Sequence, residues 1–405
     1  MVIAGAGMGG LSAGIAMGLM GQEALLVEKR DAFVELGAGI QLGPNATRIL
    51  ERWGMMKSLE THAARPERVE VFRWDLDHAL AQLELGAHFR SRYGAPYLTI
   101  HRADLQASLL ERLQAIGQTE LRLGTTLTHL SDLGDGVELV LGAQKSTSHV
   151  KAQALIGADG VSSQVRRLHW PAQHLHATPH LAYRATIAQN RLPLKWRQNS
   201  VRVFMGPQMH WVQYPIRSGE WLNIVALIEA PFDPNHRSAG LEEPLHQTWH
   251  EEVPLERRRE HFRGALKGAN AQLLELFDAV EAWSAWRLFD ADPVRGPEHM
   301  ALGHLALLGD AAHPMLPFLA QGAGMSIEDA QALAKAWSQP MLSVPRRLEA
   351  YGQDRWRRNA RVQSKARANA RIFHASGVLA GLRDWGLRQM GEKLLDMPWL
   401  YGHQG

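Results

Sequence analysis

The chain has 405 residues, of which 45% are hydrophobic, and its formal net charge at pH 7 is +3. Its length allows a large core and suits two domains, and its small net charge gives no indication of a nucleic-acid partner. The absence of cysteine excludes disulfides, a thiol nucleophile and a cysteine-ligated metal, and it fits a reducing cytoplasm. We predict no membrane span, because the sequence has no uninterrupted apolar run of about 20 residues.

The first motif is a glycine-rich turn close to the N-terminus. A short apolar strand ends at Gly5-Ala6-Gly7-Met8-Gly9-Gly10, and a small, apolar helix is expected over Leu11–Met20. In this G-x-G-x-x-G pattern, Gly5 permits a tight turn, Gly7 lets a pyrophosphate approach the backbone, and Gly10 lets the helix pack closely on the strand. The start of the helix offers free N–H groups and a positive dipole end to that pyrophosphate.

An acidic residue completes this motif. The next predicted strand, Ala24–Val27, ends in Glu28, at roughly the 20-residue spacing of an acid that accepts hydrogen bonds from a ribose. Such an acid repels a 2′-phosphate, so the motif favours the ADP-ribose of FAD or NAD. Met8 and Lys29 are further candidate cofactor contacts. The alternative is a glycine-rich turn that binds nothing.

The following segment combines a loop, a helix and short strands. Residues 37–45 contain four glycines or prolines, and we expect an irregular loop that approaches a ligand, followed by a helix over Ala46–Trp53 with Asn45 as its cap. Strands are expected over residues 69–74, 79–85 and 97–100. At the junction of the last strand with the next helix, Arg102 is placed to pair with a phosphate; the alternative is a surface salt bridge with Asp104.

A second acid follows an apolar strand near residue 157. Predicted strands over 121–129, 137–141 and 149–156 form a meander, and the last one ends in Gly157-Ala158-Asp159-Gly160. An acid at the carboxyl end of a strand in an α/β sheet is well placed for a ligand crevice.

The sequence between Pro171 and Ala285 is richer in Trp and His. Its strands alternate, over residues 201–205, 209–215 and 221–230, which predicts an antiparallel sheet that covers the ligand. Four histidines lie near its start in a proline-containing stretch without supporting acids, and we expect a solvated loop there rather than a metal site: His169, His174, His176 and His180. A charged helix is expected over Leu255–Phe277.

The third motif again places an acid and glycines after a strand. The strand His304–Leu308 is followed by Gly309-Asp310-Ala311-Ala312-His313-Pro314, and Gly322-Ala323-Gly324-Met325 opens a long helix whose N-terminus suits an anion or an electron-rich carbonyl. From Pro345 onward the helices are rich in arginine. We expect these arginines to form a solvated face rather than a surface for an acidic partner.

Three motifs follow one another along the chain: the G-x-G-x-x-G turn with Glu28, Gly157–Gly160 and Leu307–Pro314. Together they resemble the single-component (group A) flavin-dependent aromatic hydroxylases, which are similar to para-hydroxybenzoate hydroxylase. The terminal Trp399-Leu400-Tyr401-Gly402 resembles the salicylate, 3-hydroxybenzoate and 6-hydroxynicotinate hydroxylase branch. The resemblance implies an α/β fold with a Rossmann-like (GR2-type) FAD-binding domain, a β-sheet substrate domain and C-terminal helices. The FAD domain would comprise residues 1–72, 98–175 and 290–345, the substrate domain 73–97 and 176–289, and the helical segment 346–405.

The resemblance also implies roles for the motif residues. Gly5, Gly7, Gly10 and Glu28 would hold the ADP half of FAD, and Arg102 would contact its phosphates. Asp159 would serve both FAD and the pyridine nucleotide, and Asp310 would bind the ribityl chain. Pro314 would lie beside the flavin ring, and Gly322, Ala323, Gly324 and Met325 near its pyrimidine edge.

The activity implied is an NAD(P)H-consuming hydroxylation of a small phenolic or hydroxypyridine carboxylate through a flavin C4a-hydroperoxide. The chain has no second complete G-x-G-x-x-G, so NADH or NADPH would bind transiently, and O2 would be the other substrate. A homodimer is a further expectation. The alternatives are a monooxygenase of the same fold for a larger or non-phenolic substrate, and a flavin-binding protein without turnover.

Two residues of one predicted strand are candidates for the substrate site. His210 and Tyr214 share a face with Val212 between them, because side chains alternate along a strand, whereas Gln213 faces the other way. His210 could take the phenol proton, and Tyr214 could orient the phenol or its carboxylate. The alternative is a pair packed within the sheet.

The residues near the third motif bear on the choice of substrate. Pro317 stands where the resemblance to 3-hydroxybenzoate 6-hydroxylases leads us to expect glutamine, and it is more similar to the salicylate or 6-hydroxynicotinate type. Gln41 is therefore a further candidate for the substrate pocket.

Overall fold

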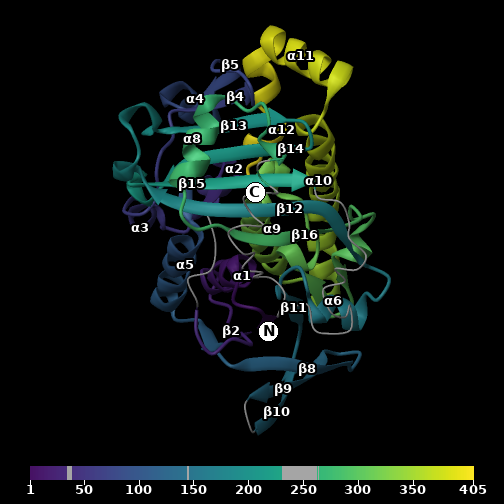
Figure 1. Cartoon of the computed structure of the whole chain (residues 1–405). Coiled ribbons are helices and arrows are strands. Elements are labelled where there is room, and N and C mark those ends of the chain that lie inside the picture. Colours follow the sequence, from purple (N-terminus) through teal and green to yellow (C-terminus); the bar gives the residue numbers. More distant parts are fainter. Residues whose placement is uncertain (34–38, 144–145, 230–261, 263) are drawn as a thin grey trace.

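The computed structural model describes residues 1–33, 39–143, 146–229, 262 and 264–405. Two large sheets organise the fold; the long helix α10 (Val344–Phe373) runs along one side of them, and α11 (Gly377–Leu395) lies at the top of the view (Figure 1). No helix among the described residues combines the length and the apolarity that crossing a membrane requires.

The N-terminal motif lies on a six-stranded, mostly parallel sheet. Its strand order is β17-β18-β11-β1-β2-β7. The strands are β1 (Val2–Ala4), β2 (Ala24–Val27), β7 (Thr119–Arg122), β11 (Leu155–Gly157), β17 (Ala301–Leu302) and β18 (Leu305–Leu307). β1 runs parallel to both of its neighbours, with Val2 opposite Leu25 on one side and Leu155 on the other. The three motif-bearing strands β1, β11 and β18 are thus adjacent, and their carboxyl ends meet at one edge.

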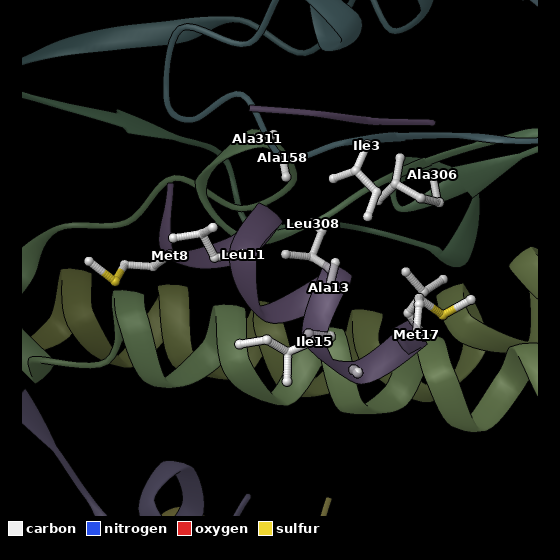
Figure 2. Packing of buried hydrophobic residues seen from close by; sticks show 14 of the residues in the cluster. Ile3, Met8, Leu11, Ala13, Ile15, Met17, Ala158, Ala306, Leu308 and Ala311 are labelled. Atoms are coloured by element: carbon white, nitrogen blue, oxygen red, sulfur yellow. The ribbon is translucent and has the colours of Figure 1, made fainter. Parts of the chain in front are cut away.

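Helices cover this sheet and bury its apolar residues. α1 (Met8–Gly18) packs against α9 (Gly322–Trp337) and α5 (Arg102–Ile116). Figure 2 shows the side chains of Leu11 and Ile15 of α1, Ile3 of β1 and Leu308, which belong to one buried apolar cluster. α1 is buried almost all round, which explains why its sequence is small and apolar rather than amphipathic.

A seven-stranded sheet forms the second layer, in the order β16-β12-β15-β14-β13-β4-β5. Its strands are β4 (Arg68–Arg73), β5 (Ala79–Glu84), β12 (Leu175–Ala188), β13 (Ser200–Gly206), β14 (Met209–Ile216), β15 (Trp221–Glu229) and β16 (Ser284–Ala291). Neighbouring strands are antiparallel except β13 and β4. One face packs with α8 (Ala271–Ala279) in a cluster that includes Trp211 and Phe277, and the other packs against the segment 316–325. This second face is therefore turned toward the third motif.

Smaller elements complete the chain. A meander is formed by β8 (Thr125–Asp132), β9 (Val137–Ala143) and β10 (Ser146–Ala152), and a two-stranded ladder by β3 (Gly39–Leu42) and β6 (Leu98–His101). The remaining helices are α2 (Pro44–Arg52), α3 (Met56–Glu60), α4 (Ala87–Tyr93), α6 (Gln164–His169), α10 (Val344–Phe373), α11 (Gly377–Leu395) and α12 (Pro398–Tyr401).

Several local predictions were wrong. The loop predicted over residues 37–45 contains β3, which pairs with β6, and residues 37 and 38 lie outside the described part. Gly43, not Asn45, is the N-cap of α2, because Pro44 suits the first helical position and Asn45 turns its amide into the core. The strand predicted over 121–129 is two strands, since Gly124 adopts a positive φ of +62° between them.

The predicted helix over Leu255–Phe277 falls partly outside the described residues. Within them it is interrupted at Gly268, whose φ is +94°, and α8 starts afresh after Asn270, whose side chain accepts a hydrogen bond from the Leu273 N–H at 2.9 Å.

Candidate flavin and substrate site

The glycine-rich turn between β1 and α1 has the geometry that a dinucleotide requires. Gly5 has a φ of +96°, and a Cβ there would lie 2.6 Å from the Ala158 carbonyl oxygen. A Cβ on Gly10 would lie 1.8 Å from the Gly5 carbonyl oxygen, so the helix packs directly on the turn. In contrast, a Cβ on Gly7 would meet no protein atom within 4 Å. The protein thus leaves space at the one glycine where a phosphate is expected to approach.

Two of the helices that begin at this edge, α1 and α9, lack a side-chain cap. Neither Gly7, the N-cap of α1, nor Gln321, the N-cap of α9, makes a capping hydrogen bond through a side chain. The first N–H groups of these helices and their positive dipole ends are therefore available to an anion or a carbonyl. Gly322 and Ala323 of α9 are half-buried, whereas Gly324 and Met325 are buried.

Glu28 holds the turn from the end of β2. Its carboxylate accepts hydrogen bonds from the N–H groups of Ala6 at 2.8 Å and Arg30 at 3.1 Å. Lys29 next to it is exposed, and desolvation lowers its pKa while the Glu28 charge opposes this. Met8 is buried in the first turn of α1. Glu28 is thus fixed beside the turn, where a ribose is expected.

Asp159 lies against the same turn from the end of β11. Its Oδ2 atom accepts from the N–H groups of Gln164 at 2.7 Å and Val165 at 3.2 Å, whereas its Oδ1 atom is buried without a partner among the described residues. A buried acceptor without a donor is costly. The hydroxyl of a bound cofactor would supply the missing donor, so the orphaned oxygen fits FAD.

Arg102 and Asp310 face this edge from α5 and from the turn after β18. Arg102 is exposed, and no hydrogen bond or ion pair joins it to another described residue. Asp104 instead lies 3.5 Å from Arg217, so the surface pair with Arg102 is not formed. Asp310 is exposed and approaches the start of α9, since a Cβ on Gly322 would lie 3.8 Å from its Oδ1.

A buried network of charges supports the third motif from behind. The His313 Nε2 atom lies 2.5 Å from Asp329 Oδ2, and Arg355 Nε donates to Asp329 Oδ1 at 2.7 Å. Burial opposes ionisation of Asp329, but the charges of His313 and Arg355 hold its pKa below the usual value. The carbonyl oxygen of Pro314 accepts from Gln363 of α10 at 2.9 Å. The turn that carries Asp310 and Pro314 is thereby fixed to α9 and α10.

A second acid of α9 extends this network. Glu328 is fully buried and lies 2.9 Å from Arg355 and 2.5 Å from Arg358, and the Asn45 amide donates to it at 2.8 Å. The expectation of a solvated arginine face is therefore wrong for Arg355 and Arg358. Their signal in the sequence was the adjacent Glu328 and Asp329 in a helix whose other residues are mostly small or apolar.

The structure places His210, Val212 and Tyr214 on the sheet face that packs against the third motif. Tyr214 belongs to the same apolar cluster as Leu316, Phe318 and Met325. Trp211 and Gln213 lie on the opposite face, where the Trp211 indole donates to Gln213 at 2.9 Å. The face assignment of this strand is therefore the expected one.

Tyr214 lies beside Gln41. A Cβ on Gly39 would lie 2.5 Å from the Tyr214 ring, so β3 crosses directly over it. The side chain of Gln41 hydrogen-bonds to Tyr214 and accepts from the Tyr97 hydroxyl at 2.8 Å. Burial raises the pKa of Tyr214 above its usual value, which keeps it a neutral hydrogen-bond donor. Gln41 and Tyr97 hold its ring in place.

His210 lies in a different part of the face, about 13 Å along the strand from Tyr214. Its ring centroid is 4.7 Å from that of Phe318 and 5.2 Å from that of Phe373, and its Nδ1 is 2.9 Å from His374 Nε2. Burial and the neighbouring histidines lower its pKa well below the usual value, so the ring is neutral at pH 7. Pro317 begins the short turn that carries Phe318, and Phe318 rather than Pro317 contacts the histidine.

Arg184 of β12 joins this face and was missed from the sequence. Along one row of the sheet, Arg184 is opposite Val225, which is opposite Val212. Its guanidinium lies 3.7 Å from the centroid of the Trp286 ring, and its Nε atom is buried without a partner. No acid among the described residues pairs with it. Burial lowers its pKa to about 9, and the nearby Tyr214 opposes this shift, so the group stays a cation at pH 7.

His180 was expected on a solvated loop and is instead buried in β12. It was mispredicted because two prolines precede it, at residues 171 and 179, whereas the strand continues through Pro179 with an irregularity in its pairing to β16. The other histidines of that stretch are more exposed.

An edge with the geometry that a dinucleotide requires thus faces a sheet that carries Arg184, for which the described residues offer no acidic partner. A family model described as an FAD binding domain matches residues 1–366. The chain is 32% identical to 3-hydroxybenzoate 6-hydroxylase of Polaromonas naphthalenivorans, over 99% of this chain and 95% of that protein. It is 34% identical to 3-amino-4-hydroxybenzoate 2-monooxygenase of Streptomyces platensis, over 100% and 96%. A variant of HpxO from Klebsiella pneumoniae complexed with FAD superposes with a TM-score of 0.81 at 22% identity, over 99% and 97%.

The chain therefore belongs to the FAD-binding domain family of monooxygenases. The predicted resemblance, fold class, FAD cofactor and flavin-dependent monooxygenase activity are confirmed at the level of the family. The domain limits and the roles of the individual site residues stay predictions.

Proposed function

We propose that this monooxygenase hydroxylates a small aromatic carboxylate that carries a phenol or a hydroxypyridine. The observation that supports this choice is Arg184 on the face that carries His210 and Tyr214, a cation that no acid in the described part of the chain pairs with. A buried charge without a partner is costly, and a substrate carboxylate relieves that cost. The planar guanidinium matches a carboxylate through two parallel hydrogen bonds, and Trp286 holds it by stacking.

The other residues of this face then acquire roles. Tyr214, held by Gln41, donates a hydrogen bond that orients the substrate, and the neutral ring of His210 accepts the phenol proton, which makes the aromatic ring electron-rich. The apolar side chains of the face and of residues 316–325 exclude water from the reacting atoms. FAD, when bound, would carry the electrons of NADH or NADPH to O2 and so supply the activated oxygen.

The cofactor would be held by the residues of the parallel-sheet edge. Gly7 and the start of α1 would receive the pyrophosphate, Glu28 and Asp159 would accept from hydroxyls, and Arg102 would pair with a phosphate. Asp310 and the start of α9 would lie along the ribityl and flavin part, with Pro314 beside the ring. NADH or NADPH would reduce the flavin and leave, and O2 would be consumed. A homodimer and a cytoplasmic location are further parts of the proposal.

The test is oxidation of NADH and NADPH by the FAD-loaded protein with salicylate, 3-hydroxybenzoate, 4-hydroxybenzoate and 6-hydroxynicotinate, with products identified by mass. We expect one of these acids to accelerate oxidation and gain one oxygen atom. Phenol and the matching carboxamide are controls, and they should stimulate far less because they lack the anion for Arg184. Equal stimulation by the uncharged controls would overturn the role of Arg184. No stimulation by any aromatic acid would favour a larger or non-phenolic substrate, or a protein without turnover.

A further inference from the structure

Four titratable side chains gather at one end of the face that carries His210. They come from four elements: His180 from β12, His210 from β14, Glu229 from β15, and His374 from the end of α10. His374 joins two of the others, because its Nε2 lies 2.9 Å from His210 Nδ1 and its Nδ1 lies 2.7 Å from Glu229 Oε1. The order His210, His374, Glu229 is thus a continuous hydrogen-bonded chain.

This chain leads from the interior to the surface. His210 is 1% exposed and His374 is 6% exposed, whereas the side chain of Glu229 is 35% exposed. The aromatic rings of Phe318 and Phe373 flank His210. A proton accepted by His210 therefore reaches solvent along this chain without crossing apolar contacts.

The hydrogen bonds also determine which ring nitrogens carry protons. A carboxylate oxygen only accepts, so the Nδ1 of His374 must donate to Glu229. A neutral His374 then has a bare Nε2, which must accept from the Nδ1–H of His210. A neutral His210 consequently has its bare nitrogen at Nε2, and this atom has no hydrogen-bond partner among the described residues. The chain thus holds His210 in the tautomer that a base needs.

The charges around His374 keep it neutral. Burial and then the Arg383 charge lower its pKa to about 4. Arg383 of α11 donates to the carbonyl oxygens of Ile372 and Phe373, and it pairs with Asp384 at 2.8 Å. Arg73 of β4 lies 3.8 Å from the same Asp384. From β12, the Nε2 of His180 lies 3.8 Å from Glu229 Oε1, and burial lowers the His180 pKa to about 4.

A metal ion is a weaker interpretation of the same cluster. The ligand atoms of His180, Glu229 and His374 all lie within 4.8 Å of one another. Two ligands of one tetrahedral zinc ion, each about 2.1 Å from the metal, lie about 3.4 Å apart. The 2.7 Å between His374 Nδ1 and Glu229 Oε1 is instead a hydrogen-bond distance with a proton between the atoms.

We propose that His374 and Glu229 are positioning residues that fix His210 as the base and conduct its proton to solvent. This inference rests on the proposed function. The substrate O–H bond breaks as its proton passes to His210 Nε2; the Nδ1 proton of His210 passes to His374 Nε2, and the Nδ1 proton of His374 passes to Glu229. The electron pair stays on the substrate oxygen, and no oxidant or reductant is needed.

The first experiment determines the tautomer of His210 and does not depend on turnover. Nitrogen-15 NMR of the histidine-labelled holoenzyme should show His210 protonated at Nδ1, and Glu229→Gln should change that tautomer population, because its amide can also donate. His176→Gln, an exposed histidine change on β12, is the matched control and should leave the signal unchanged. A wild-type His210 protonated at Nε2 would overturn the proposal, whether or not the chosen substrate is correct.

The second experiment follows the proton during binding and turnover. With the best aromatic acid, the absorbance of the bound phenol should show it ionised in the wild type. In His374→Asn and His374→Phe the ionisation should move to higher pH, and kcat below the phenol pKa should fall at least tenfold, recovering as the pH rises. An unchanged pH profile in both variants, with the wild type active, would overturn the relay, whereas an inactive wild type would count against the proposed function. Micromolar Zn2+ binding that is lost in His180→Gln would identify a metal site and also overturn the relay.

Discussion

Gly7 and Gly10 occupy the same first turn of α1, and replacing each by alanine separates cofactor binding from packing. In Gly7→Ala the new methyl group meets no protein atom within 4 Å, and the backbone there has an ordinary φ of −75°. The apoprotein should therefore keep its stability or gain about 0.4–1 kcal/mol from a less flexible unfolded chain. The methyl group lies where the pyrophosphate is expected, so FAD affinity should fall at least tenfold, which is about 1.4 kcal/mol.

Gly10→Ala should behave in the opposite way. Its methyl carbon would lie 1.8 Å from the Gly5 carbonyl oxygen, far inside the 3.4 Å at which ordinary contact begins, so α1 and the turn must move apart. Overpacking of this kind costs about 1–3 kcal/mol or more, and the displaced turn should also lose FAD.

The assay compares the thermal unfolding of the two apoproteins and titrates each with FAD, followed by the quenching of flavin fluorescence. The expected pattern is normal unfolding with weak FAD binding for Gly7→Ala, and early unfolding for Gly10→Ala. The reasoning would be refuted if Gly7→Ala bound FAD as tightly as the wild type, or if it unfolded as early as Gly10→Ala.

Three further predictions concern the charged groups. Arg184→Gln should raise the KM for a hydroxybenzoate by about tenfold to a hundredfold, because a charged hydrogen bond contributes about 1.5–3 kcal/mol, whereas the exposed Arg191→Gln should leave steady-state kinetics unchanged. Asp329→Asn should destabilise the protein by about 3–5 kcal/mol in urea unfolding, because it removes one of the two carboxylates that compensate the buried Arg355 and leaves only Glu328; a loss below 1 kcal/mol would contradict this. The pKa of Asp329 is lower in the folded state than in the unfolded state, so its contribution to the free energy of unfolding is present above the unfolded pKa of about 3.9 and is lost as the pH falls further. The stability of the wild type should therefore decline below that pH, and Asp329→Asn should make the decline less steep.

The cofactor edge could be predicted because each of its motifs is local. The roles of Gly5 and Gly10 follow from the turn that joins a strand to the next helix, and these contacts lie within a few residues of one another. The rule that ligands bind at the carboxyl ends of parallel strands assigned Asp159 to a ligand crevice, and in the structure its strand β11 lies between β1 and β18. Short-range geometry and this general rule were sufficient to place these motifs at one edge.

The substrate face could be predicted only in part. Alternation along β14 placed His210 and Tyr214 together, but it could not show that His374, 164 residues further on, would contact His210. Arg184 was missed because its significance is that no acid among the described residues lies next to it, and this depends on how β12, β15 and β14 pair side by side. Asn45 was assigned to a helix cap on local preference, whereas its amide is needed by Glu328, 283 residues away.

The arrangement of the parallel sheet has a consequence for the order in which the protein can be assembled during synthesis. β11 pairs with β18, so one edge of the nascent sheet stays open until residue 307 has emerged from the ribosome. The buried acids of α9 gain their arginine partners only when α10 has been synthesised, and Arg358 of α10 in turn donates to the carbonyl oxygen of Leu400 at 3.0 Å. Such long-range pairing is slow and leaves strand edges exposed to aggregation. FAD binds only the completed edge, so the cellular supply of flavin shifts the balance between finished protein and aggregate by mass action.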